Sequence, residues 1–235
     1  MLGCPVDIVD MDAAVARLIE LVDVPAPVER PAIVVTLNPE MVMRARREPG
    51  FRALLEGAAL LVPDGIGLVR ALRRRGFPRL TRVGGADLLE AYLPHAVRHG
   101  HRVALAGGFG DTAERAADVL RARHPDLDVV AAPGDPDGAT AARLAAMTPN
   151  LVCAAYGAGL QERFLRDHLG SIGAAAGIGV GGTLDFLAGR ARRAPDLVRR
   201  AGLEWLWRLA HEPSRLRRQL VLPQFWWLER REAAK

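Results

Sequence analysis

The sequence predicts an α/β fold: a parallel-sheet, Rossmann-like domain with helices on both faces, followed by a C-terminal helical appendage. Short apolar runs alternate with longer segments of helical periodicity, which is typical of strand–helix–strand units. Half of the 235 residues are apolar, enough to bury the core of one such domain. All four tryptophans lie in a basic segment near the C-terminus. We therefore expect a domain at residues 1–194 and an appendage at residues 195–235.

Six apolar runs supply the strands of the predicted sheet. The first, "AIVVTL" at 32–37, predicts a buried strand because it is β-branched and uncharged. The other runs lie at 59–63, 102–107, 127–132, 151–157 and 174–182. Strands that alternate with helices in this way form a parallel sheet, because each helix carries the chain back to the same edge.

Helical segments separate these runs. Asn38 and Pro39 predict the start of one helix, because Asn is a good N-cap and Pro suits the first helical position. Further helices are expected within 13–22, 64–75, 85–100, 111–124 and 137–147. The segment "RARRAPDLVRRAG" at 190–202 marks the change from the compact domain to the appendage.

Polar residues gather just after the predicted strands. In open parallel sheets, ligands bind beyond the carboxyl ends of the strands. The segments at those ends read "TLNPE", "VPDGIG", "AGGFGD", "AYGAGLQE" and "GVGGTLDF", and four of the five contain glycine. Their Thr, Asn, Asp, Gln and Tyr side chains are more than packing requires, so we expect a functional site at this edge.

Asp64, in "LLVPDGIGL" at 60–68, has two interpretations. As a helix cap, its carboxylate accepts backbone N–H bonds, which lower its pKa and weaken it as a base. As a catalytic group, it is held at the end of a strand among the other polar residues of this edge. The segment taken alone slightly favours the cap.

Three other motifs are weak when taken alone. "AGGFGD" suits a phosphate at a helix N-terminus, as in a nucleotide-dependent oxidoreductase, but it lacks the third glycine of the dinucleotide fingerprint. Asp135 and Asp137 have a spacing used for divalent metals, although "PGDPDG" is also a strong turn signal. For His95, His99 and His101, a solvated helix end is favoured over a zinc site because no partner motif accompanies them.

Composition argues against several classes of protein. The chain has no run of 18 or more uncharged apolar residues, so no membrane-spanning helix is expected, and its N-terminus lacks the pattern of a signal peptide. Cys4 and Cys153 are too few for a disulfide framework or a zinc site, which favours a cytoplasmic location. No GxSxG nucleophile elbow is present.

The C-terminal segment carries the positive charge. Residues 190–235 hold twelve Lys or Arg against five Asp or Glu, a net of +7, whereas the whole chain is +5. This localised charge makes a general nucleic-acid surface less favoured. Trp and Arg together suit a membrane interface, with the rings at headgroup depth and the guanidinium groups on phosphates. A helical pair packed on its own domain, or on another subunit of a homo-oligomer, explains these residues equally well.

Taken together, the motifs resemble those of the WecG/TagA/CpsF glycosyltransferase family. The resemblance spans residues 30 to 220 approximately. It is carried by "TLNPE", "VPDGIG", "RVGGADLL", "AGG", "YGAGLQE", "GVGGTLDFLAGRARRAPDLVRRAGLEWLWRL" and "EPSRLRR". The last two stretches are hard to place in any other family.

The resemblance implies an inverting transfer of an N-acetylhexosamine-type sugar, such as N-acetylmannosamine or its uronic acid, from UDP. The implied acceptor is a GlcNAc-type sugar on undecaprenyl diphosphate, at the inner face of the cytoplasmic membrane, in surface polysaccharide or teichoic acid synthesis. Neither a cofactor nor an essential metal is implied. The family's proposed base corresponds to Asp64, and its C-terminal arginines, thought to meet the lipid diphosphate, correspond to Arg208, Arg215 and Arg218.

The resemblance also implies a substrate pocket. Its polar residues correspond to Thr36, Asn38, Arg82 and Gln161. Neighbouring residues of the same strand ends are expected to bind substrate with them: Gly107, Gly108, Tyr156, Gly157 and Asp185. The segment "GAGLQE" has Gly159 where the family has proline, so we expect a less rigid loop before Gln161. The alternatives to an active transferase are a non-catalytic membrane adaptor and a nucleotide-dependent oxidoreductase.

Overall fold

The protein, described here by a computed structural model, contains a six-stranded sheet, and the structure describes residues 1–24, 28–211, 216 and 220–233. The sheet order is β2-β1-β6-β5-β3-β4, and all neighbouring strands are parallel. The predicted parallel sheet is therefore confirmed, and the carboxyl ends of all six strands lie at one edge. The strands are β1 (Ala32–Leu37), β2 (Leu60–Pro63), β3 (Val103–Gly107), β4 (Val129–Ala132), β5 (Leu151–Ala155) and β6 (Ala176–Gly179).

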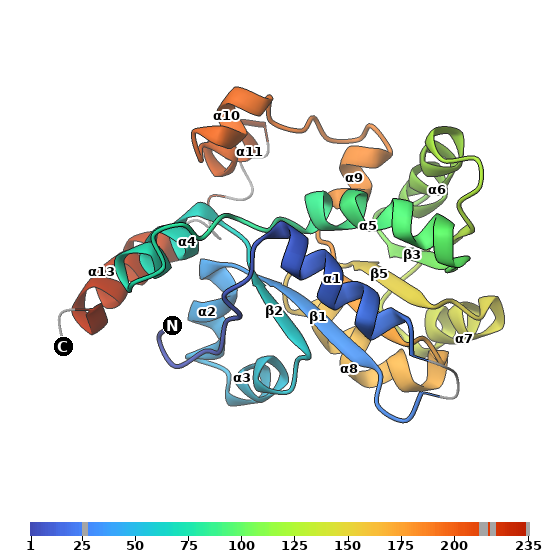
Figure 1. Ribbon diagram of the computed structural model, residues 1–235, viewed down its shortest axis with the longest axis horizontal. Helices are drawn as coiled ribbons and strands as arrows, with labels where there is room; N and C mark the ends of the chain where they lie inside the picture. The colour runs from blue at the N-terminus through green and yellow to red at the C-terminus, as the bar shows by residue number, and fades with distance from the viewer. Residues whose placement is uncertain (25–27, 212–215, 217–219, 234–235) are drawn as a thin grey trace.

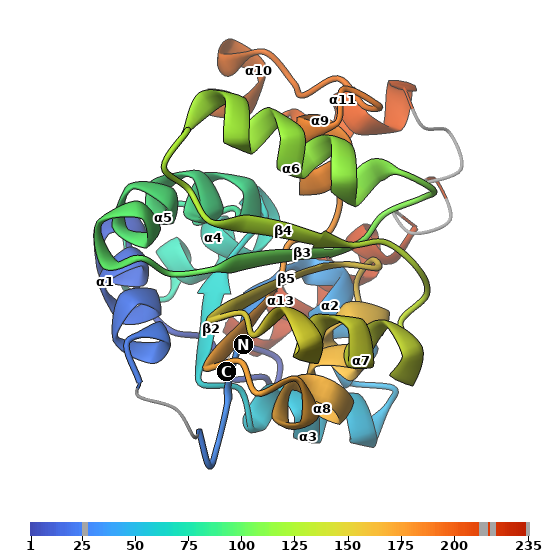
Figure 2. The same cartoon turned by 90° about the vertical axis from the view of Figure 1, so that its right-hand side faces the viewer.

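Helices cover both faces of the sheet, as predicted (Figures 1 and 2). Alternate side chains of the strands point to opposite faces, and each set packs against its own helices. One face carries α1 (Met11–Val22), α5 (Gly85–His99), α6 (Thr112–Arg123) and α9 (Thr183–Leu187). The other carries α2 (Pro39–Ala45), α3 (Pro49–Glu56), α4 (Ile66–Arg74), α7 (Gly138–Met147) and α8 (Leu160–Ile172).

The C-terminal segment forms two separate parts. A connecting segment separates the short helices α10 (Asp196–Arg200) and α11 (Glu204–His211) from α9, and α13 (Val221–Ala233) runs beside α4 (Figure 1). Phe225 of α13 is fully buried in the core beneath α2 and α4, whereas Trp226 and Trp227 are 42% and 55% exposed. One side of α13 therefore packs on its own domain, and its tryptophans face outward. Within the described residues, no helix is long and apolar enough to cross a membrane.

The predicted elements agree well with the observed ones. All six strand positions are confirmed, and Asn38 caps α2 by accepting a hydrogen bond from the Met41 N–H at 3.1 Å. Three further helices, α3, α8 and α9, lie in segments for which the sequence predicted no element. Both free cysteines are buried, in agreement with the absence of a disulfide framework. The division between residues 194 and 195 stays a prediction.

The packing of α13 yields a prediction for stability. Phe225→Ala should lower the free energy of unfolding by about 3–5 kcal/mol, because it removes a buried ring and leaves a cavity. Trp227→Ala, the matched control on the same helix, should change it by less than about 1 kcal/mol, because the ring is exposed. Urea unfolding measures both. Equal losses in the two variants would show that α13 does not dock through Phe225.

Candidate functional site

A cleft of about 240 Å³ lies at the carboxyl ends of β1 and β2. The strand ends form its floor, and residues from α11, α13 and the segment before α11 form its walls. This is the edge at which the sequence predicted a functional site. The residues that line the cleft include Asn38, Asp64, Arg82, Arg199, Glu204, Trp205 and Trp226.

Asp64 is fixed to the cleft floor by the backbone. It directly follows β2, and its N–H donates to the Leu37 carbonyl of β1 at 2.8 Å. Gly65 turns the chain with φ +98°, and α4 begins one residue later. The N-cap of α4 is Gly65, and no side chain bonds to that cap. Asp64 is therefore not a helix cap, and its carboxylate is directed to other partners.

The carboxylate of Asp64 pairs with Arg82. Arg82 Nη1 donates to Asp64 Oδ1 at 3.0 Å. Arg82 lies in the connection between α4 and α5, and the N–H of the next residue, Val83, donates to the Pro63 carbonyl at 3.0 Å. The end of β2 therefore fixes both partners, which keeps the acid and the guanidinium together in the cleft.

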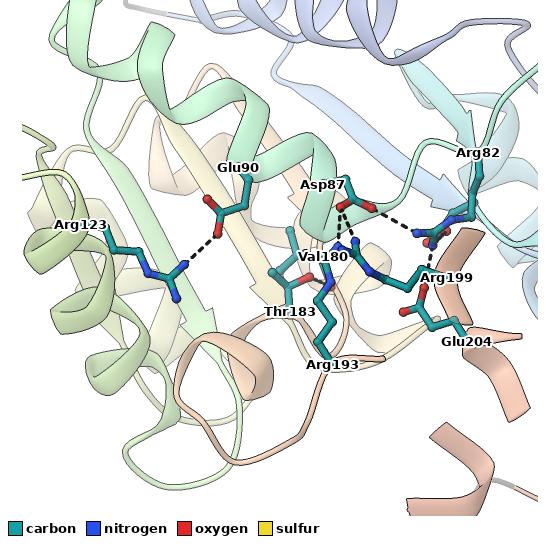
Figure 3. Close-up of polar contacts among 10 residues, drawn as sticks. Arg82, Asp87, Glu90, Arg123, Val180, Thr183, Arg193, Arg199 and Glu204 are labelled. Carbon is teal, nitrogen blue, oxygen red and sulfur yellow. Dashed lines mark hydrogen bonds and ion pairs between the residues drawn. The ribbon is translucent and has the colours of Figure 1, made fainter. Parts of the chain in front are cut away.

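Asp87, in the first turn of α5, is the centre of a larger ionic network (Figure 3). Its Oδ2 accepts a hydrogen bond from Arg82 Nη2 at 3.1 Å. Its Oδ1 accepts from Arg193 and, at 3.3 Å, from Arg199 Nη1. Arg82 Nη1 also lies 3.3 Å from Glu204 Oε2 at the start of α11. The network thus joins the strand ends to the C-terminal segment.

Burial raises the pKa of Asp64 above its ordinary value, although the positive charge of Arg82 opposes the shift. The negative charges of Glu204 and Asp87 add to the increase. A carboxylate with a raised pKa binds a proton more strongly, so it is a better general base than an ordinary aspartate. Because Asp64 does not cap the helix, the low pKa expected of a cap does not arise.

The other predicted pocket residues lie in different surroundings. Asn38 lines the cleft, although its side-chain oxygen also caps α2. Thr36 is buried and donates to the Gly179 carbonyl at 3.1 Å. Gln161 is 3% exposed, donates to Glu162 at 2.7 Å and accepts from the Gly181 N–H at 3.1 Å. Thr36 and Gln161 therefore do not belong to the described residues that line the cleft.

A second group of predicted residues lies at the ends of β3 and β5. Gly107, Gly108 and Gly157 have positive φ values, and a Cβ at Gly107 would lie 2.6 Å from the ring of Tyr156. The Tyr156 hydroxyl is buried and has no hydrogen-bond partner among the described residues. Asp185 follows β6 instead and lies in the first turn of the short helix α9, where its backbone carbonyl accepts hydrogen bonds from the N–H groups of Arg190 and Ala191. These residues are separate from those lining the cleft at Asp64.

The predicted C-terminal arginines are only partly covered by the structure. Arg208 lies in α11, but its side chain is outside the described part. Arg215 and Arg218 lie outside the described residues altogether. Their predicted contact with a lipid diphosphate therefore stays a prediction.

The metal-like motifs have structural explanations. Asp137 caps α7 by accepting from the Thr140 N–H at 2.8 Å, as a turn residue does. The prediction that the histidines form a solvated helix end is wrong for His101, which is buried. His101 bonds to Asp23 at 2.9 Å and to the Tyr92 hydroxyl at 2.7 Å. His101, His99 and Asp23 place their ligand atoms within 4.8 Å of one another, the one such group among the described residues. The group lies at the amino ends of the strands, away from the cleft.

Sequence reasoning missed four members of the ionic network, namely Asp87, Arg193, Arg199 and Glu204. Each lies inside a motif that carries the family resemblance: "RVGGADLL" contains Asp87, and the long stretch at 179–209 contains the other three. The residues are far apart in sequence, and their convergence depends on the tertiary structure. The sequence offered one signal for these residues, namely that charged side chains recur within the motifs of the family resemblance.

A sequence model of the glycosyl transferase WecG/TagA/CpsF family matches residues 1–235, the full chain. The chain belongs to this family. It is also 32% identical over 200 residues to the N-acetylglucosaminyldiphosphoundecaprenol N-acetyl-beta-D-mannosaminyltransferase of Bacillus spizizenii (strain ATCC 23059 / NRRL B-14472 / W23). That match covers 83% of this chain and 77% of the Bacillus protein. The resemblance inferred from the motifs is confirmed.

Gly159, at the position where the resemblance led us to expect proline, lies in a loop that hydrogen bonds connect to its surroundings. Its φ of +92° is inaccessible to proline, and an added Cβ would lie 1.6 Å from Arg44 Nη1. Arg44 thus occupies the space beside the glycine, and it donates to the Ala158 carbonyl at 3.0 Å. Glu162 accepts a bond from the Gly159 N–H. These contacts hold the loop that we expected to be less rigid.

This arrangement predicts that Gly159 and Arg44 are coupled. Gly159→Ala should lower the free energy of unfolding by about 2 kcal/mol, because it strains a left-handed φ and displaces Arg44. In an Arg44→Ala background the same change should cost at least about 0.5 kcal/mol less, because the overlap is gone. Urea unfolding of the double-mutant cycle tests this.

The control for the cycle is Gly138→Ala. A Cβ at Gly138 meets no atom within 4 Å, and this glycine is not among those with a positive φ. The control should therefore leave stability nearly unchanged. Strictly additive costs of Gly159→Ala and Arg44→Ala would contradict the account of the loop.

Proposed function

We propose that this glycosyltransferase moves an N-acetylmannosamine-type sugar from UDP to a GlcNAc-type acceptor on undecaprenyl diphosphate, with inversion at the anomeric carbon. Family membership and the name of the Bacillus relative support the sugar and the acceptor. The observation that carries the proposal is Asp64, a carboxylate with a raised pKa in a cleft that also contains Arg82.

In the proposed reaction, Asp64 acts as general base in a single displacement. Its carboxylate takes the proton of the attacking acceptor hydroxyl, whose oxygen forms a bond to the anomeric carbon of the donor. The bond from that carbon to the diphosphate breaks on the opposite face, and UDP leaves with the bonding electrons. One bond forms as the other breaks, so the configuration inverts.

The leaving diphosphate needs positive charge beside it. Arg82 lies next to the base and presents a guanidinium group, which suits phosphate oxygens. Arg199 lines the same cleft. Such groups stabilise the developing charge on UDP, the role that a divalent cation has in many other transferases. We therefore propose that turnover does not depend on an added metal ion.

The surface beside the cleft suits a lipid-linked acceptor. Trp227 is exposed, and the guanidinium of Arg231 lies 4.6 Å from its ring centre. Trp226 is also exposed and lines the cleft itself. Exposed Trp and Arg bind the headgroup region of bilayers. We propose that α13 contacts the inner face of the cytoplasmic membrane and brings the lipid diphosphate to the cleft.

The direct test is UDP release from UDP-N-acetylmannosamine, with a short-chain prenyl-diphosphate-GlcNAc acceptor. Release should require the acceptor and should persist in EDTA. Asp64→Asn should reduce the rate at least about 100-fold, because an amide cannot take the proton. The control Asp126→Asn, at an exposed site away from the cleft, should keep the wild-type rate.

Two outcomes would contradict the proposal. Full activity of Asp64→Asn would remove Asp64 as the base. No release from any UDP-N-acetylhexosamine, with binding to anionic vesicles retained, would favour the non-catalytic membrane adaptor instead.

A further inference from the structure

Arg82 is shared by three carboxylates, and the contact with Glu204 is the longest of the three. Asp64 and Asp87 accept its hydrogen bonds at 3.0 and 3.1 Å, whereas Glu204 Oε2 lies 3.3 Å from Nη1. The same nitrogen, Nη1, therefore faces both Asp64 and Glu204. Figure 3 shows Glu204 approaching Arg82 from the C-terminal segment. Glu204 thus presents an anionic oxygen to Arg82 inside the cleft.

The ionic network at the cleft has no surplus positive charge for an anionic ligand, and Glu40 adds a further negative charge to the lining. Three arginines (82, 193 and 199) face three carboxylates, those of Asp64, Asp87 and Glu204. A nucleotide diphosphate ester brings about two negative charges at neutral pH, and like charges in a partly buried site repel strongly. Binding of the diphosphate is therefore favoured if one carboxylate moves away.

Asp64 and Asp87 are poorly suited to move. The N–H of Asp64 is bonded to β1, so its position is set by the sheet. Asp87 lies in the first turn of α5 and holds Arg193 and Arg199 as well as Arg82. Displacing Asp87 would break three ion pairs at once, whereas displacing Glu204 breaks one contact with Arg82.

Glu204 lies on a helix that has little anchorage in the core. Among the α11 residues whose side chains the structure describes, none is buried, and Leu206 is 47% exposed. Gly202, with φ +73°, joins α10 to α11. Segments with few buried apolar contacts open at low free-energy cost. The first turn of α11 can therefore shift without disturbing the sheet.

We propose that Glu204 occupies, before a nucleotide binds, the position at which the diphosphate meets Arg82, and that Arg199 completes this diphosphate site. Both arginines line the cleft, and Asp87 binds each of them and so fixes their spacing. Diphosphate binding displaces Glu204 from Arg82 and moves the start of α11. Release of the product lets Glu204 return. This inference rests on the proposed function, since it concerns the same cleft.

The test is isothermal titration of UDP into wild type and Glu204→Gln. The substitution keeps the shape of the side chain but removes the competing charge, so UDP should bind about 5- to 10-fold more tightly. Uridine, which lacks phosphates, should bind both proteins equally. Glu56→Gln makes the same change in net charge at an exposed site and should leave UDP affinity unchanged.

A second variant tests the role of Arg199. Arg199→Gln should weaken UDP binding at least 5-fold in both the wild-type and the Glu204→Gln backgrounds, and it should leave uridine binding unchanged. Thermal unfolding of each variant should match wild type within a few degrees, which separates a binding effect from loss of the fold.

The outcomes separate the two proposals. If UDP binds wild type and Glu204→Gln equally, or binds the variant more weakly, Glu204 does not hold the diphosphate position and the inference is overturned. Unchanged UDP affinity in Arg199→Gln would overturn the assignment of Arg199. If UDP binds none of the proteins, the proposed function itself fails.

Discussion

The guanidinium group of Arg82 lies among the carboxylates of Asp64, Asp87 and Glu204, which come from a strand end, the start of α5 and the start of α11. Three parts of the chain therefore meet at one side chain. The backbone bonds of Asp64 to β1 and of Val83 to β2 fix this meeting point on the sheet. The parallel sheet supplies a rigid edge, and the ionic network attaches the less buried C-terminal segment to that edge.

The same network determines the chemistry available in the cleft. Burial raises the pKa of Asp64 even though Arg82 lies 3.0 Å away, so the group keeps the basicity that proton abstraction needs. A raised pKa also means that the folded protein binds the proton of Asp64 more tightly than the unfolded chain. Its contribution to stability is therefore present at low pH and is lost as pH rises through the folded pKa. At neutral pH, the ionised carboxylate of Asp64 therefore lowers the free energy of unfolding.

The sequence predicts the sheet and the place of Asp64 because both depend on local patterns, namely apolar runs and a polar residue after each strand. It does not predict α3 or α8, whose N-caps are Glu48 and Gly159 and so lack the usual Ser, Thr, Asp or Asn signal. Two partners of Arg82, Asp87 and Glu204, were also missed. Glu204 lies more than a hundred residues along the chain from Arg82, so their contact depends on the tertiary structure. Gln161 followed a strand as predicted, yet its amide bonds within the protein.

The most direct test of this account is the pKa of Asp64, measured by titration of its side-chain carbon in a ¹³C NMR experiment on the empty protein, with Asp64→Asn used for assignment. The account predicts a value above the ordinary aspartate value of about 3.9. Removing the positive charge with Arg82→Gln should raise the pKa further. A value below 3.9 would mean that the ion pair outweighs burial. Asp64 would then be a structural partner of Arg82, and the proposed base would have to be sought elsewhere in the cleft.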